Sequence, residues 1–92
     1  MNNAKMNNAK MNETLNHINT VKTLATNNPS KCFRVNAGFY YISVDSVLWV
    51  VDYNVELSGN EKWIAYEDNN MGNAMYTDPY ATKRELLEAL RG

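Results

Sequence analysis

The chain has 92 residues, of which 45% are hydrophobic and 21% charged, and its formal net charge is −1. These values are typical of one folded domain with a modest core, and they exclude an intrinsically disordered chain. They also exclude a membrane span and a secretory signal, because no apolar run approaches the roughly 20 residues that a span needs and the first lysines are followed by no apolar segment.

The first ten residues read Met-Asn-Asn-Ala-Lys twice, and Met11 and Asn12 begin a third copy. A five-residue period matches neither a helix nor a strand, and three copies are too few for a solenoid. Duplicated coding sequence with alternative starts at Met1, Met6 or Met11 is the simpler interpretation. The alternative is a polar arm that becomes ordered on a phosphate backbone. We predict a flexible arm over residues 1–11 and a single α+β domain over residues 12–92.

The first predicted helix begins at Asn12, whose side chain can cap it, and ends before Pro29, because proline disfavours helical backbone in the preceding residue. Its opposite face is polar and nearly uncharged. Its apolar residues recur every three or four positions and predict one buried stripe, made of Leu15, Ile18, Val21, Leu24 and Ala25.

The middle of the chain has a β pattern. Four segments rich in aromatic and β-branched residues are separated by short turn signals: Cys32–Val35, Phe39–Val44, Val47–Val55 and Lys62–Tyr66. Connections this short predict an antiparallel meander. In the third strand one face is predicted to lie in the core: Val47, Trp49, Val51, Tyr53 and Val55. Since the second strand is apolar on both sides, the sequence leaves open which sheet face the two helices cover.

A second helix is predicted near the end of the chain, after an irregular loop over residues 67–79. Thr82 and Glu85 have the spacing of a capping box, in which the threonine caps the helix and the glutamate reaches back to the threonine amide. Leu86, Leu87 and Leu90 follow and can pack on the sheet. The predicted fold is therefore α+β, with an N-terminal helix, a four-stranded antiparallel β-meander and a C-terminal helix.

The sequence holds little that suggests chemistry. His17 and Cys32 are the only histidine and cysteine, and their predicted positions favour a surface histidine and a structural cysteine over a nucleophilic pair. They are too few for a zinc site, and the isolated glycines form no phosphate-binding loop. We predict no catalytic residue, metal or cofactor, and a protein that is not an enzyme. The lone cysteine also fits a reducing cytoplasm.

The acidic residues are concentrated late in the chain. Seven of the ten lie between positions 45 and 78, where Lys62 is the only base, whereas residues 1–34 carry five bases and one acid. Such a separation orients a protein on a charged partner. The acidic sector, a predicted partner-binding surface, comprises Asp52, Glu56, Glu61, Glu67 and Asp68. The basic sector, a predicted contact with an RNA backbone, comprises Lys5, Lys10, Lys22, Lys31 and Arg34.

The aromatic residues allow a further interpretation, in which nucleic acid bases stack on the sheet surface. The β region is also the acidic region, however, so a phosphate chain laid along it is repelled. Trp49 and Trp63 are accordingly predicted to lie in the core.

In overall character the chain resembles the small proteins that phages encode to block host defences, and in particular anti-CRISPR proteins that act on the type I-F surveillance complex. The resemblance covers the length, the asparagine-rich residues 1–28, the strand run Cys32–Tyr66 and the Thr82–Leu90 helix. It implies an inhibitor that binds this ribonucleoprotein stoichiometrically, on its backbone or tail subunits, in the cytoplasm of a host bacterium. A contact with the guide RNA is left open. The inhibitor would block hybridisation of target DNA to the guide, with no membrane and no small-molecule substrate involved.

Two other functions fit the same sequence. One is a small nucleic-acid-binding regulator that acts through the basic N-terminal helix. The other is a phage structural or accessory subunit that forms homo-oligomers through its tyrosines. A charge pattern of both signs favours the inhibitor, because a ribonucleoprotein displays protein bases beside RNA.

Overall fold

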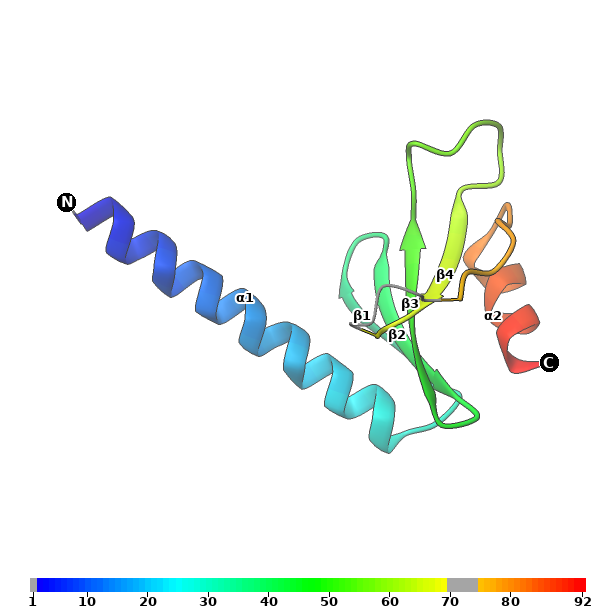
Figure 1. Cartoon of the computed structure of the whole chain (residues 1–92), viewed down its shortest axis with the longest axis horizontal. Helices are drawn as coiled ribbons and strands as arrows, with labels where there is room; N and C mark the ends of the chain where they lie inside the picture. The colour runs from blue at the N-terminus through cyan, green and yellow to red at the C-terminus, as the bar shows by residue number, and fades with distance from the viewer. Residues whose placement is uncertain (1, 70–74) are drawn as a thin grey trace.

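The computed structural model describes the backbone of residues 2–69 and 75–92 and the side chains of residues 14–69 and 75–92. The elements follow in the order α1 (Asn2–Asn27), β1 (Cys32–Asn36), β2 (Phe39–Val44), β3 (Val47–Tyr53), β4 (Trp63–Glu67) and α2 (Lys83–Arg91) (Figure 1). The strands pair in chain order, each antiparallel to the next. The predicted α+β fold with its antiparallel meander is confirmed.

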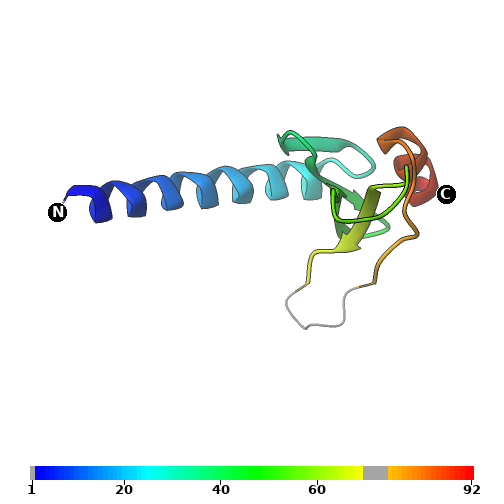
Figure 2. The same ribbon diagram turned by 90° about the horizontal axis from the view of Figure 1, so that it is seen from above.

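Helix α1 begins at Asn2, so the N-cap predicted at Asn12 is wrong. Each copy of the repeat contains two asparagines, which are weaker helix formers, and one each of methionine, alanine and lysine, which are good ones. The backbone is helical through Asn12 without a break. The segment predicted as an arm, residues 1–11, therefore has helical backbone from residue 2, and its flexibility in solution stays a prediction. Figure 2 shows this part of α1 extending away from the sheet. The side chains of Lys5 and Lys10 lie outside the described residues.

Only part of the predicted apolar stripe of α1 is buried. Val21 and Ala25 are buried and Ile18 packs against them, whereas Leu15 and Leu24 are 54% and 44% exposed. Each helical residue turns the chain by about 100°, so Leu24 points well away from the neighbouring Ala25. Leu15 lies one turn before the first residue that packs on the sheet. The contact face of α1 is therefore narrower than the sequence predicts.

The two helices cover opposite faces of the sheet, which the sequence left open. On one face the β2–β3–β4 side chains Ile42, Val51 and Ala65 pack with Leu86 and Leu87 of α2. On the other face the α1 residues Val21 and Ala25 pack against Tyr41 and Val50. We call these the α2 face and the α1 face. Because side chains alternate along a strand, neighbouring residues of one strand serve different cores.

Tight turns fix the register of the sheet. Asp45 and Ser46 join β2 to β3 with φ angles of 52° and 67°, the left-handed backbone that a two-residue hairpin requires. Gly38, between β1 and β2, has a φ of 77°. A Cβ at Gly38 would lie 3.2 Å from the Cβ of Tyr53, so glycine is needed here both for its backbone and for space.

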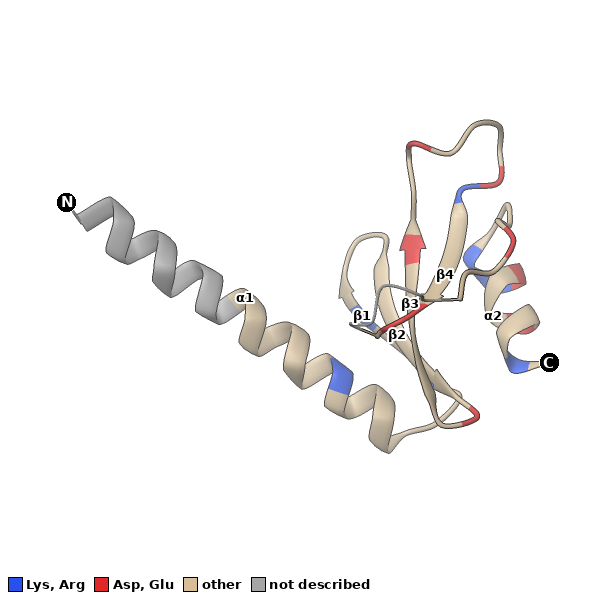
Figure 3. Ribbon diagram, in the orientation of Figure 1, with Lys and Arg blue, Asp and Glu red and all other residues tan. Residues whose placement is uncertain are grey.

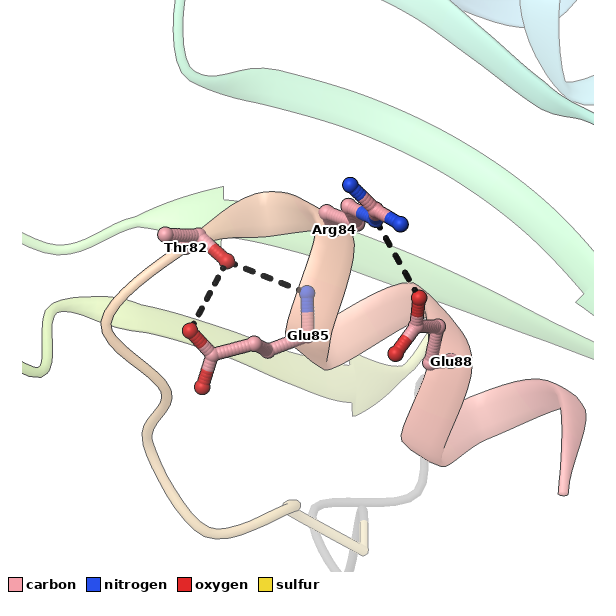
Figure 4. A network of polar contacts seen from close by, with 4 residues as sticks. All are labelled: Thr82, Arg84, Glu85 and Glu88. Carbon is pink, nitrogen blue, oxygen red and sulfur yellow. Dashed lines mark hydrogen bonds and ion pairs between the residues drawn. The ribbon is translucent and has the colours of Figure 1, made fainter.

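Helix α2 begins where its sequence predicts. The Thr82 hydroxyl accepts a hydrogen bond from the Glu85 amide at 3.1 Å and donates to Glu85 Oε1 at 3.2 Å (Figure 4). The glutamate therefore accepts from the threonine hydroxyl and not from the threonine amide. One turn further on, Arg84 and Glu88 form an exposed ion pair of 3.2 Å.

The segment 76–80 runs beside β4 and forms two isolated antiparallel bridges with it, so the outer edge of this strand is partly covered. At the end of α2, Arg91 Nε donates to the Ser30 carbonyl at 3.0 Å. This bond joins the last helix to the segment that precedes β1.

Candidate functional site

The acidic sector does not form one surface. Asp52 and Asp68 lie on the α1 face, Glu67 lies on the α2 face, and Glu56 and Glu61 lie in the loop between β3 and β4. Figure 3 shows that the acidic residues are spread over several strands and connections. The sheet separates the first two groups, because residues 67 and 68 alternate across it. Glu67 is also engaged within the chain, since its Oε1 accepts a hydrogen bond from the Met75 amide at 3.1 Å.

The basic sector is divided in the same way. Lys22 projects from α1, whereas Arg34 lies on the α2 face and is exposed. Lys31 is exposed just before β1.

An ion pair joins the two sectors within the chain. Lys22 Nζ lies 3.0 Å from Asp68 Oδ2, and the two side chains are 33% and 27% exposed. The same ammonium lies 5.5 Å from the centre of the Tyr41 ring. These contacts engage one base and one acid that the sequence assigns to partner binding.

Burial changes the titration of several groups on the α1 face. Desolvation, with a smaller contribution from Asp68 and Tyr66, raises the pKa of Tyr41 to about 12. Desolvation, with a contribution from Asp52, also raises the pKa of Tyr66. The pKa of Asp52 is itself raised by burial. Asp52 is therefore a partly buried carboxylate beside tyrosines and is poorly placed as an exposed anchor.

A hollow of about 540 Å³ opens on the α2 face, where the β1–β2 turn meets the ends of β3 and β4. We call it the aromatic hollow, and it is lined by Arg34, Ala37, Gly38, Tyr40, Tyr53 and Trp63. Tyr53 and Trp63 are paired across the strands, with ring centres 5.3 Å apart and planes at 64°. The Tyr40 ring centre lies 6.1 Å from that of Trp63. Lys83 Nζ lies 4.1 Å from the centre of the Tyr40 ring.

The prediction that both tryptophans are core residues holds only in part. Trp49 and Trp63 pack against the α2-face core, but both are only partly buried, and Trp63 also lines the hollow. Tyr53, predicted to lie in the core, is 43% exposed. The register explains this, because Tyr53 ends β3 beyond the reach of α2. A cross-strand aromatic pair directly flanking a loop is the sequence signal that could have indicated the hollow.

The β3–β4 loop, residues 54–62, connects the two paired aromatics of the hollow and projects from the sheet (Figure 1). The strand predicted to continue to Val55 stops at Tyr53, because the Asn54 side chain accepts from the Glu56 amide at 3.0 Å and turns the chain. Further bonds of 2.8 and 3.2 Å close the loop, from Asn54 N to Lys62 O and from Leu57 N to Asn54 O.

The only base of this loop is turned inward. Lys62 Nζ donates to the carbonyls of Leu57 and Val55. Glu56 and Glu61 remain exposed, and the described residues provide neither with an ion pair. The loop therefore presents two carboxylates and the 72% exposed Val55 on a hydrogen-bonded frame.

His17 and Cys32 lie apart, as their predicted roles require. His17 Nε2 is 3.0 Å from the Val35 carbonyl, whereas Cys32 packs against the α2-face core. Burial raises the pKa of the Cys32 thiol, against a smaller lowering effect of Lys83 and Arg91. The two side chains do not form a nucleophile–base pair.

Among the described residues, no three His, Cys, Asp or Glu side chains gather as a metal site would require. Within the same part of the chain, no helix has the length and hydrophobicity to cross a bilayer. Comparison with protein-family models, curated proteins and solved structures gives no match.

Proposed function

We propose that this chain is an inhibitory binding protein that acts on a CRISPR surveillance complex of type I-F in the cytoplasm of a host bacterium. It would bind the complex stoichiometrically and prevent hybridisation of target DNA to the guide RNA. The proposal begins from the resemblance to phage anti-CRISPR proteins. The β3–β4 loop is the structural observation that supports it best.

This loop has the properties of an anchor for a basic surface. Because Lys62 is bonded to carbonyls of the loop, the charged groups that the loop exposes are the carboxylates of Glu56 and Glu61. Its internal hydrogen bonds hold the backbone in place before binding, which lowers the entropy lost on association. A surveillance complex holds its heteroduplex in a positively charged channel, and carboxylates on a projecting loop are suited to occupy bases that would otherwise contact DNA.

Of the five acids predicted to bind the partner, we assign the main contact to Glu56 and Glu61. Asp68 is paired with Lys22, Glu67 accepts from the Met75 amide, and Asp52 is partly buried. A partner that contacts Asp68 or Glu67 shares a carboxylate that already makes an interaction within the chain. Glu56 and Glu61 make no ion pair with the described residues, so their carboxylates are available to a partner.

The experiment compares two double charge reversals with the same change in formal charge. Glu56→Lys with Glu61→Lys alters the loop, and Asp78→Lys with Glu88→Lys alters two exposed acids outside it, of which Glu88 also loses its exposed ion pair with Arg84. We expect the loop variant to bind the purified type I-F complex about tenfold more weakly, mainly through a slower association rate. The control variant should keep its affinity and its block of target DNA binding.

Unchanged inhibition and unchanged salt dependence in the loop variant would falsify the assignment of the loop. Two further measurements on the wild-type chain test the other functions. Salt-sensitive gel shifts with free duplex DNA would instead favour a regulator that acts through α1. Oligomers in light scattering would favour a structural subunit.

A further inference from the structure

We propose that the aromatic hollow binds an unstacked nucleotide, with the base stacked on the exposed ring of Tyr53 beside Trp63 and the phosphate held by Arg34. The inference rests on the proposed function in one respect, since a ribonucleoprotein partner would supply the nucleotide from exposed RNA. The binding chemistry itself belongs to this chain and can be measured on the isolated protein.

The shape and the rings of the hollow fit a base. Its volume of about 540 Å³ falls within the range of roughly 300–1,000 Å³ that is usual for small-ligand sites. Tyr53 is 43% exposed and stands edge-on to Trp63 at 5.3 Å, so two ring surfaces meet at an open corner. Stacking of a base on an aromatic side chain contributes about 1–3 kcal/mol and tolerates any base.

The backbone leaves this corner open. Ala37 and Gly38 line the hollow next to Tyr53, and neither has a large side chain. The Gly38 carbonyl accepts from the Tyr53 amide at 2.9 Å, which holds the turn against the end of β3. The hollow is therefore built by two connected elements and does not depend on one flexible loop.

The charges select an anionic ligand. The lining contains one base, Arg34, and no acid. Arg34 is exposed and has no hydrogen bond or ion pair to the described residues. Lys83, over the Tyr40 ring, adds a second positive charge at the margin. A lysine or arginine from a protein partner would be repelled here, whereas a phosphate next to a base satisfies both the charge and the rings.

The hollow and the β3–β4 loop thus adjoin, because Tyr53 and Trp63 are the residues on which the loop begins and ends. The hollow is suited to a nucleotide, which carries a phosphate and an aromatic base, and the loop presents carboxylates to cations. Acidic Glu56 and Glu61 lower the affinity of the hollow for long polyanions, so we expect it to prefer a single splayed nucleotide over a continuous strand.

The test is an amide-correlation NMR titration of the full chain with adenosine, adenosine monophosphate, uridine monophosphate and short single-stranded RNA and DNA. We expect shifts at the Gly38 amide and the Trp63 indole, with the Trp49 indole unchanged as an internal control. Arg34→Gln should weaken binding of both monophosphates about fivefold and leave adenosine unchanged. Tyr53→Ala should weaken the binding of adenosine and of both monophosphates about fivefold or more.

Lys31→Gln is the matched control, because Lys31 is an exposed base close in sequence that does not line the hollow. The same spectra show whether each variant is folded. The inference is overturned if millimolar monophosphate shifts no hollow residue, or if Arg34→Gln and Lys31→Gln bind equally well. Equal affinities for RNA and DNA would support recognition of the base and the phosphate alone. A higher affinity for RNA would support the guide RNA as the source of the bound nucleotide.

The loop variant Glu56→Lys with Glu61→Lys separates this inference from the proposed function. If the hollow is a nucleotide site, this variant keeps its monophosphate shifts and binds RNA strands more tightly, even when it no longer binds the surveillance complex. If the chain does not bind that complex at all, the titration still shows whether the hollow binds nucleotides.

Discussion

The ion pair between Lys22 and Asp68 offers the sharpest test of the charge arrangement. The perturbation is a double-mutant cycle with Lys22→Met, Asp68→Asn and the combined variant. At 3.0 Å, two unit charges in bulk water attract by about 1.4 kcal/mol, and the partly buried setting raises this value while ordering of the lysine lowers it. Measured coupling for exposed pairs is about 0.2–1 kcal/mol. We expect a coupling near the upper end, about 1 kcal/mol.

The assay is urea unfolding of the four proteins at low and high salt, followed by fluorescence. The coupling energy should fall at high salt, because ions screen the exposed part of the pair. An independent readout is Tyr41, whose pKa is raised partly by the charge of Asp68. Asp68→Asn should therefore lower the Tyr41 pKa from about 12, which carbon NMR of labelled tyrosine can follow.

A coupling of zero at low salt, with no change in the titration of Tyr41, would refute the pairing. Lys22 and Asp68 would then be free to contact a partner, as their positions in the sequence suggest. A measured coupling means that a partner using either residue competes with an interaction that the chain already makes.

Three further predictions follow from burial. Burial raises the pKa of Asp52, so the folded state holds this proton more tightly than the unfolded state. The free energy of unfolding therefore falls as pH rises through the unfolded and folded pKa values of Asp52. Asp52→Asn should raise the urea midpoint at neutral pH but not in acid. Cys32, with its raised pKa, should react with a maleimide more slowly than free cysteine, as mass spectrometry would show. Leu86→Ala should lower the unfolding free energy by about 2–5 kcal/mol in the same urea assay, whereas Ala89→Gly, an exposed helix control, should cost about 1 kcal/mol.

The local elements of this fold could be predicted because their signals are short in range. Thr82 and Glu85 define a helix start by themselves, and the turns at Gly38 and Asp45 separate runs of β-forming residues. The position of the helices could not be predicted in this way. Phe39–Val44 is apolar on both sides, and only the packing shows that one side takes α1 and the other α2.

The candidate site was harder to predict, because linear clustering of charge does not specify a surface. Glu67 and Asp68 are adjacent in sequence yet face opposite layers, so a sector of acids is divided wherever it runs through a strand. The inward turn of Lys62 depends on the carbonyls of Val55 and Leu57, which only the closed loop brings within reach. The hollow needs Arg34 and Trp63 from opposite edges of the sheet, nearly thirty residues apart.

The order of the sheet has a consequence for how the protein folds. Spatial order and chain order are the same from β1 to β4, so each pairing joins strands that a short connection separates. Closing such connections costs little entropy, and chains with local contacts fold quickly. The β2–β3 hairpin, with its two-residue turn, is the natural starting point, and the Arg91–Ser30 bond can close only when α2 docks. The meander therefore predicts rapid folding of the sheet, with docking of α2 as a later step.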